Sequence, residues 1–253
     1  MKTNQTVIKA ISAIAFIFAI ASVASVSLLV SCNKDESATP DNQLSIPILK
    51  DSENSLIFPV KSHPYGKSYS EWAASFFNWQ YAFTCEQFPY YDETGALQNQ
   101  NQSGHVFFLG GAPRKLPPLN TQREVTVPPN VSLFVPLIYY YANDCAAAPG
   151  GDLVANATQF STFMNQLSLK IDGKSYEMED FLTITPIFNY IANADLVNCT
   201  GDVCFDGHQH PVCMSGYWVI IKKLSPGTHT IHTFAGTTLD SRVKDVIWTI
   251  HQQ

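Results

Sequence analysis

A proline-glycine turn between two β-rich runs, in the segment GYWVIIKKLSPGTHTIHTFAG at residues 216–236, constrains the fold most strongly. Pro226 presets φ for the second position of a turn, and Gly227 supplies the positive φ that a type II turn needs at its third position. Residues 217–221 form a continuous apolar run, as expected of a strand covered on both faces, whereas residues 228–234 mix β-branched residues with two histidines. The sequence therefore predicts one strand entering this turn and one leaving it.

Two other segments have the spacing of amphipathic helices. Residues 66–83 contain Ser68 and Glu71 at the spacing of a capping box, so Glu71 is expected to cap the helix and not to act as an acid catalyst. The apolar stripe of this helix, which we expect to face the core and not to form a ligand platform, consists of Trp72, Phe76, Trp79 and Phe83. Residues 153–167 repeat apolar side chains at the same spacing and predict a second helix.

Several short segments are typical of strands. Residues 105–109, 125–127, 131–141 and 243–251 are rich in β-branched and aromatic side chains. Pro136 interrupts the third of these segments and indicates an edge strand or a bulge, and residues 167–178 predict a hairpin that turns at Asp172 and Gly173. We therefore expect a mainly β fold, an antiparallel two-layer β-sandwich with two helical insertions, formed by a single domain at residues 46–253.

The N-terminal 31 residues differ in kind from the rest of the chain. Lys2 and Lys9 precede an apolar run at residues 10–30, which ends in the tetrapeptide LVSC with its cysteine at Cys32. This ending resembles the lipobox of a bacterial lipoprotein signal, whose processing would remove residues 1–31 and leave Cys32 as the lipidated N-terminus. The alternative is a transmembrane anchor, because the apolar run is long enough to span a bilayer.

A polar segment without periodicity follows at residues 32–45, as expected of a flexible tether. Its triplet KDE at residues 34–36 resembles the acidic export signal that sends lipoproteins of the Bacteroidetes to the outer face of the outer membrane. The predicted localisation is therefore the outer membrane, with the membrane as a partner through the lipid anchor and the body exposed at the cell surface.

Charge and cysteine content indicate which kinds of partner and which cellular compartment to expect. Removing residues 1–31 lowers the number of basic side chains from 15 to 13 against 21 acidic ones, which gives a net charge of −8. Nucleic acid is therefore not an expected partner. Besides Cys32 there are five cysteines, so we expect at most two disulfides and one remaining thiol in an oxidising compartment. The disulfide candidates are Cys85, Cys145, Cys199, Cys204 and Cys213.

Five motifs are spread over most of the mature chain. They are GKSYSEW at residues 66–72, YDETG at 91–95, GHVFFLGG at 104–111, VTVPPNVSLFVPLI at 125–138 and GYWVIIKKLSPGTHTIH at 216–232. These motifs resemble those of a family of secreted bacterial proteins of unassigned activity, and the resemblance implies a secreted β-rich fold without supplying a catalytic residue. Relatives tend to carry two further cysteines, where this chain has Ala96 or its neighbours and Glu124. The segment LSPG at residues 224–227 also resembles the corner of fibronectin-type sandwiches, where the chain crosses between sheets.

The densest group of potential ligands is the segment CTGDVCFDGHQHPVC at residues 199–213. In an extended segment His208 and His210 point to the same side, so both imidazoles could bind one Zn²⁺ or Cu²⁺, with Asp206 or Asp202 completing the shell. The alternative is a polar loop held by disulfides, because secreted cysteines usually pair and the spacing matches no zinc motif. The sequence indicates no other cofactor.

The other polar residues are expected to have structural roles. His229 and His232 lie three positions apart on a predicted strand and so on opposite faces, where each is expected to be hydrogen-bonded locally. Asp92 with Glu93, and the acidic residues at 177–180, are carboxylates of the kind a glycosidase needs, but turn roles are favoured for them. The sequence contains no Gly-x-Ser-x-Gly elbow, phosphate loop or His-Glu-x-x-His helix.

The remaining signal is aromatic, because the chain has 11 Tyr, 16 Phe and 4 Trp in runs too dense for every ring to be internal. Exposed rings stack on sugar faces, and the candidate ligand-binding residues are Tyr90, Tyr91, Tyr139 and Tyr141. In a strand the last two share one face and Tyr140 takes the other, so we expect one of the two sets to be outward. We therefore predict a lipid-anchored envelope protein that binds an extracellular ligand, such as a glycan, without catalysis. The alternatives are a metal-dependent enzyme built on the histidine pair above, and a structural or adhesive envelope protein.

Overall fold

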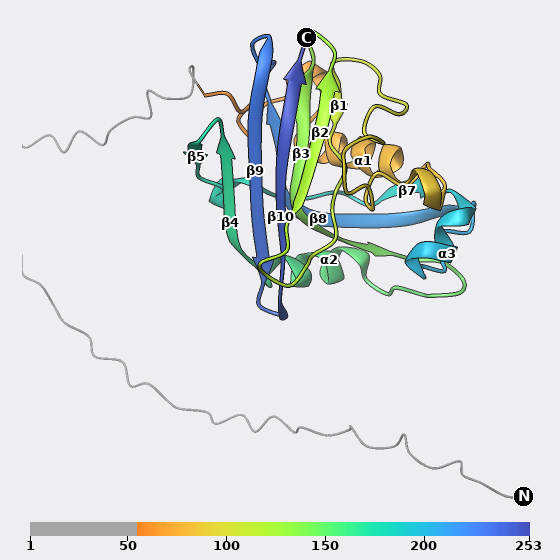
Figure 1. Cartoon of the computed structure of the whole chain (residues 1–253). Coiled ribbons are helices and arrows are strands. Elements are labelled where there is room, and N and C mark those ends of the chain that lie inside the picture. Colours follow the sequence, from red (N-terminus) through yellow and green to blue (C-terminus); the bar gives the residue numbers. More distant parts are fainter. Residues whose placement is uncertain (1–54) are drawn as a thin grey trace, which may run out of the picture. The chain divides into compact units, whose positions relative to one another are not determined.

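In the computed structural model residues 55–253 are described, and they form a mainly β body with two five-stranded sheets and three α-helices (Figure 1). The predicted signal peptide, Cys32, the tether at residues 32–45 and the predicted domain start at residue 46 lie outside these residues. Among residues 55–253, no helix is long and apolar enough to span a bilayer.

The first sheet is built around the long strand β8 (Gln209–Ile221), which pairs with β3 (Ser132–Asn143). The sheet continues beyond β3 with β1 (Val106–Phe108), while β6 (Leu182–Ile184) and β7 (Phe188–Ile191) pair with the other edge of β8. The second sheet has the order β2 (Thr121–Val127), β10 (Asp240–Gln252), β9 (Gly227–Thr237), β4 (Met164–Ile171) and β5 (Lys174–Tyr176).

Both sheets are mixed, which corrects the prediction of a purely antiparallel arrangement. Strand β1 runs parallel to β3 and β2 runs parallel to β10, whereas the other strand pairs of residues 55–253 are antiparallel. Parallel pairing joins strands that no tight turn can connect, so local turn signals did not reveal it. Two open sheets that share an apolar core fit the predicted sandwich.

Helix α1 (Tyr69–Gln80) begins at the predicted capping box, in which Ser68 and Glu71 each accept a hydrogen bond from the other's backbone N–H. Helix α2 (Leu153–Ser161) is shorter than predicted, because the chain enters β4 at Met164, where it pairs with Thr237 of β9. The sequence did not predict the short α3 (Val197–Thr200). Within residues 55–253 four 3-10 helices complete the helical structure, at Pro64–Gly66, Cys85–Gln87, Glu179–Phe181 and Ala194–Leu196.

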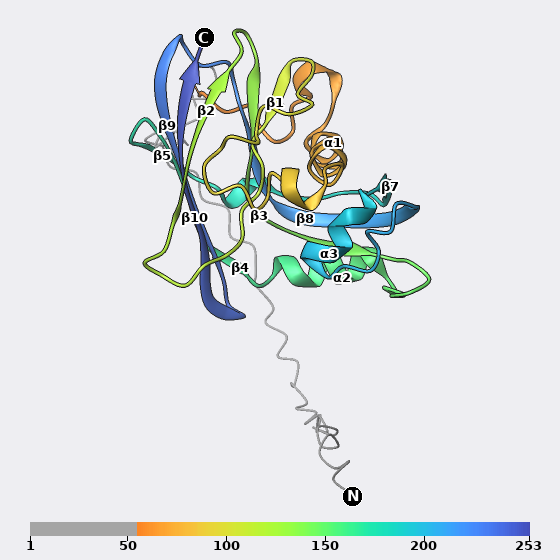
Figure 2. The same cartoon turned by 45° about the vertical axis from the view of Figure 1, so that its right-hand side comes forward.

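Two apolar cores lie on the two faces of the first sheet, so this sheet is a middle layer, with α1 on one side and β2, β9 and β10 on the other (Figure 2). The core between the sheets includes Leu133 of β3, Ile231 of β9 and Trp248 of β10. The core beneath α1 includes Phe76 and Phe134, whose ring centroids lie 5.1 Å apart. The predicted aromatic stripe therefore faces the core, although its last member, Phe83, lies beyond the end of α1.

Both glycine-containing pairs lie where the chain passes from one strand to the next, but only Asp172-Gly173 closes a hairpin. The turn at residues 225–228 joins β8 to β9, which lie in different sheets, so it carries the chain from one sheet to the other. Gly227 there has a positive φ, as predicted, but its value of +133° differs from the value of about +80° in a type II turn, so the predicted turn type was wrong. The hairpin between β4 and β5 turns at Asp172 and Gly173, whose φ values of 49° and 79° match a type I′ turn.

Two disulfides, Cys85–Cys199 and Cys145–Cys204, and the buried free thiol of Cys213 confirm the prediction of at most two bridges and one remaining cysteine. Cys85 follows α1 and Cys145 follows β3, so the loop that contains Cys199 and Cys204 is attached to both. Burial raises the pKa of the Cys213 thiol. Structural disulfides persist in oxidising compartments, which supports a location outside the cytoplasm.

Candidate functional site

The tyrosines predicted to bind ligand take different positions. Tyr91 is 42% exposed. Tyr139 and Tyr141 share one face of β3, as predicted, but that face lies against α1, where both rings pack into the core. On the opposite face Tyr140 stacks on Phe160, with ring centroids 4.0 Å apart and planes at 12°. Neither set of rings points to solvent, so the expectation of an outward pair on this strand was wrong.

A β-bulge explains this placement. The pairing of β3 with β8 shifts register between Pro136 and Ile138, as Pro136 indicated, and the alternation of side chains reverses there. Phe134 faces α1 before the bulge, and Tyr139 and Tyr141 face it after the bulge. Because helix α1 covers one face of β3 and the second sheet with α2 covers the other, the tyrosine run is partly buried on both sides.

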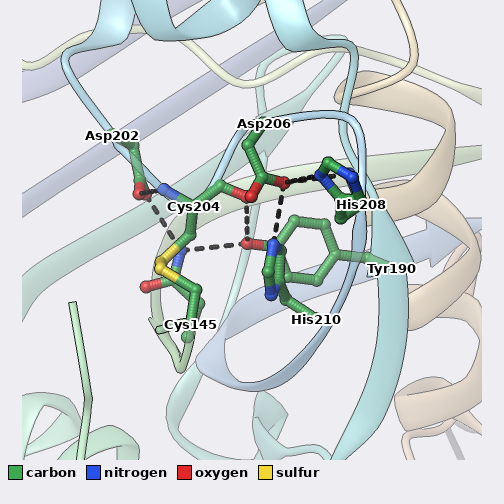
Figure 3. Close-up of polar contacts among 8 residues, drawn as sticks. Cys145, Tyr190, Asp202, Cys204, Asp206, His208 and His210 are labelled. Atoms are coloured by element: carbon green, nitrogen blue, oxygen red, sulfur yellow. Dashed lines mark hydrogen bonds and ion pairs between the residues drawn. A yellow bond between two sulfur atoms is a disulfide. The ribbon is translucent and has the colours of Figure 1, made fainter. Parts of the chain in front are cut away.

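Figure 3 shows the histidines and carboxylates of the loop at residues 199–213. Asp206 Oδ1 lies 2.8 Å from His210 Nε2 and 3.4 Å from His208 Nδ1. Asp202, the other candidate ligand, instead accepts hydrogen bonds from two side chains of β3. Within the part of the chain that the structure describes, no group of three or more His, Cys, Asp or Glu side chains is placed to hold a metal ion. The geometry therefore favours the polar loop held by disulfides.

The remaining candidate polar residues have structural partners. His229 Nδ1 lies 2.7 Å from Asp172 Oδ2, and His232 Nε2 lies 2.7 Å from Asp245 Oδ1, which confirms local hydrogen bonding for both histidines. Burial lowers the pKa of His229, but its hydrogen bonds to Asp172 and to a backbone carbonyl outweigh burial and leave this pKa above its ordinary value. Asp92 accepts hydrogen bonds from backbone groups of its own turn, which confirms its turn role.

A cleft of about 470 Å³ beside α1 combines aromatic rings with polar groups, and we call it the aromatic cleft. Its aromatic lining consists of Tyr65, Trp72, Trp79, His105 and Phe108. Its polar lining includes the side chains of Lys67, Ser75, Asn101 and Ser103. Ligand sites of this size typically pair apolar surface with a few polar groups that fix the orientation of the ligand.

The rings of the aromatic cleft differ in exposure. Tyr65 is 44% exposed, whereas Trp72 and Trp79 are 8% exposed each. Tyr65 stacks on His105 with ring centroids 5.0 Å apart and planes at 14°, and its hydroxyl lies 2.9 Å from Ser132 Oγ. Both indole N–H groups donate to backbone carbonyls, at 2.8 and 2.9 Å. The indoles are therefore fixed in place, and Tyr65 with His105 forms the accessible aromatic wall.

The backbone around the aromatic cleft is held in unusual conformations. Tyr65, Asn101 and Gly104 all have left-handed φ values, of 56°, 49° and 78°. A left-handed residue other than glycine costs about 1–2 kcal/mol, so the surrounding structure must hold Tyr65 in place. Tyr65 is not among the predicted ligand-binding residues, although the tripeptide Pro64-Tyr65-Gly66 is a turn signal that places a tyrosine at a loop tip.

A smaller pocket of about 170 Å³ contains two of the predicted tyrosines, and we call it the inter-sheet pocket. Tyr90 and Tyr139 line it together with Arg114, with Thr237 of β9 and with Lys244 of β10. Burial raises the pKa of Tyr139 to about 12 and also raises that of Tyr90, so both hydroxyls are protonated at neutral pH. The structure thus brings together Tyr90 and Tyr139 in one pocket and places Tyr91 and Tyr141 outside its lining.

Comparison with known proteins indicates no family. No protein-family model matches the chain, and no curated protein matches it. Among solved structures, the solution structure of amebosin is similar with 10% identity and a TM-score of 0.17, over 52% of this chain and 89% of that chain. A TM-score this low does not indicate a shared fold, so this likeness contributes nothing to an assignment of function.

Proposed function

We propose that this protein is a lipid-anchored envelope protein that binds an extracellular glycan in the aromatic cleft, on a β-sandwich scaffold and without catalysis. The observation that carries the proposal is the pairing of an exposed aromatic wall, Tyr65 on His105, with a polar rim in one cleft. Sugars have apolar faces and hydroxyl edges, so they suit rings bordered by amide, hydroxyl and ammonium groups.

Charge favours a neutral or weakly charged glycan over a polyanion. The mature chain would carry 13 basic and 21 acidic side chains, which repels strongly acidic polymers. Lys67 is the cation of the aromatic cleft, and its ammonium group lies 4.7 Å from the Trp72 ring centroid and 3.0 Å from Ser75 Oγ. Lys67 therefore already has partners in the free protein and does not create a strong anion site.

We expect Tyr65→Asn to weaken glycan binding by about tenfold, which corresponds to about 1.4 kcal/mol. Asparagine tolerates the left-handed backbone at this position, so the substitution removes the ring without adding strain. The measurement is a glycan array to find the ligand, followed by titration calorimetry. Tyr91→Asn is the matched control, because Tyr91 has nearly the same exposure, 42% against 44%, and lies outside the aromatic cleft.

Failure to bind any sugar on a broad array would leave the adhesive or structural envelope role as the better proposal. Equal losses in the Tyr65 and Tyr91 variants would place binding elsewhere on the surface. The metal-dependent enzyme receives no support from the geometry around Asp206.

Membrane anchoring is a separate part of the proposal and has its own test. We expect Cys32→Ala to abolish incorporation of labelled fatty acid and to move the protein from the detergent phase to the aqueous phase, because this thiol is the proposed attachment point. Phase partitioning and metabolic lipid labelling measure this. Cys213→Ala is the control, since it removes a buried thiol of the body. Labelling of the Cys32 variant at the level of the wild type would contradict the assignment.

A further inference from the structure

Lys244 is a lysine side chain buried at the border of the two sheets. It lies on β10, is 4% exposed, and lines the inter-sheet pocket. Its Nζ donates to the carbonyl of Pro136 at 2.6 Å. That carbonyl lies where the register of β3 shifts, so the amine supplies a donor to the interrupted ladder.

The charges around Lys244 oppose protonation of its amine. Burial, followed by repulsion from the guanidinium of Arg123, holds the pKa of Lys244 well below its ordinary value. No carboxylate of residues 55–253 lies within ion-pair distance of its Nζ. Arg114, the other cation of the pocket, is paired with Asp240 at 2.8 Å. A neutral amine still donates to Pro136 and keeps its lone pair, which makes it a nucleophile.

The pocket that Lys244 lines also holds proton donors. The hydroxyls of Tyr90 and Tyr139 stay protonated at neutral pH because burial raises the pKa of each. Tyr139 is engaged by Gln80, whereas the Tyr90 hydroxyl has no hydrogen-bond partner within residues 55–253. The volume of about 170 Å³ is close to that of cavities of about 150 Å³ that hold one benzene molecule. A compound of up to six carbons would fit.

We propose that Lys244 forms a reversible imine with a small aldehyde or ketone that enters the inter-sheet pocket, with the Tyr90 hydroxyl as hydrogen-bond donor to the carbonyl oxygen. The Nζ lone pair attacks the carbonyl carbon, and the C=O π electrons move to the oxygen, which takes one of the two amine protons to give a carbinolamine. The second amine proton leaves with this oxygen in the next step. Loss of that oxygen as water forms the C=N bond. The products are one imine and one water molecule, so the step needs no oxidant or reductant.

A purely structural role for Lys244, as a cap on the Pro136 carbonyl, would need neither a cavity lined by this lysine nor an unengaged phenol in the same lining. The proposal adds a covalent site that is independent of the glycan site, because the residues that line the inter-sheet pocket and the aromatic cleft do not overlap.

The test is reductive trapping of the full mature protein with glycolaldehyde and cyanoborohydride at pH 6, followed by peptide mapping. The exposed lysines Lys170 and Lys174 are the reference positions for the rate of labelling. We expect Lys244 to be modified at least tenfold faster than either, with an advantage that shrinks as the pH approaches 10. Each unit by which its pKa lies lower gives about a tenfold larger neutral fraction.

Two variants separate chemistry from packing. Lys244→Met should lose the labelled peptide without affecting the surface lysines, and Tyr90→Phe, which keeps the ring, should slow labelling of Lys244 several-fold at unchanged melting temperature. Labelling of Lys244 no faster than Lys170 in the folded wild type would overturn the proposal. An unchanged rate in Tyr90→Phe would overturn the role of the phenol.

Discussion

Replacing Cys85 and Cys199 together by alanine is expected to lower the free energy of unfolding by about 4–5 kcal/mol. This bridge joins positions 114 residues apart, whereas Cys145–Cys204 joins positions 59 residues apart. A longer closed loop restricts the unfolded chain more, so loop length alone makes the first bridge about 0.6 kcal/mol more stabilising. Equilibrium unfolding in urea under non-reducing conditions measures both double variants.

Local contacts act against this loss. The backbone N–H of Cys85 donates to Asp195 Oδ2 at 2.8 Å, so the segment after α1 is attached to the turn before α3 even without the sulfur atoms. Cys213→Ala is the control for removing a buried sulfur, and we expect a loss of about 1 kcal/mol from it. A loss below about 1 kcal/mol in the Cys85 and Cys199 double variant would show that these other contacts suffice.

The elements that the sequence predicted correctly are those whose signals are local. The capping box at Ser68 starts α1, and the type I′ pair Asp172-Gly173 forms a hairpin. The alternation at residues 243–251 predicts that Val246, Trp248 and Ile250 face inward, and these side chains of β10 are buried in the core. In each case a few neighbouring residues determine the backbone conformation, so no knowledge of distant segments is required.

The features that the sequence did not predict depend on contacts between distant segments. The parallel pairing of Val246 with Thr121 brings β10 beside β2, and nothing local to either strand encodes it. The bulge at Pro136 was indicated, but its consequence for Tyr139 and Tyr141 was not, because the face they occupy depends on where α1 packs. The aromatic run at residues 139–141 therefore packs against the core on both faces of β3 and does not form an exposed platform.

The candidate sites were predicted in part. Tyr90 and Tyr139 do line one pocket, yet its chemistry comes from Lys244, a charged residue at an inward position that composition does not favour. Tyr65 and His105 are both at exposed positions, and their stacking depends on the left-handed turn at residue 65. Sequence periodicity cannot place rings that belong to two different loops side by side.

Arg123 shows how a buried charge can stabilise this fold. It occupies an inward position of β2, is 2% exposed, and donates through three nitrogens to backbone carbonyls of two segments. The acceptors are the carbonyls of Tyr90, Asp92, Gly110 and Gly111. Its guanidinium also lies 5.0 Å from the ring centroid of Trp248. Burial lowers the pKa of Arg123 to about 10, so it is charged at neutral pH.

We expect Arg123→Met to lower the free energy of unfolding by about 3–5 kcal/mol, because several buried carbonyls lose their donor at once. Arg123→Lys is the matched control, since it keeps the charge but not the planar fork, and it should lose roughly half as much. Urea unfolding measures the loss in both variants. Where the Met variant remains folded, the pKa of Lys244 should rise because a like charge is gone, and imine trapping of Lys244 at pH 6 should slow. A free energy of unfolding of the Met variant within 1 kcal/mol of wild type would mean that solvent or neighbouring groups replace the guanidinium. Trapping of Lys244 as fast as in wild type would show that Arg123 does not lower the pKa of this amine.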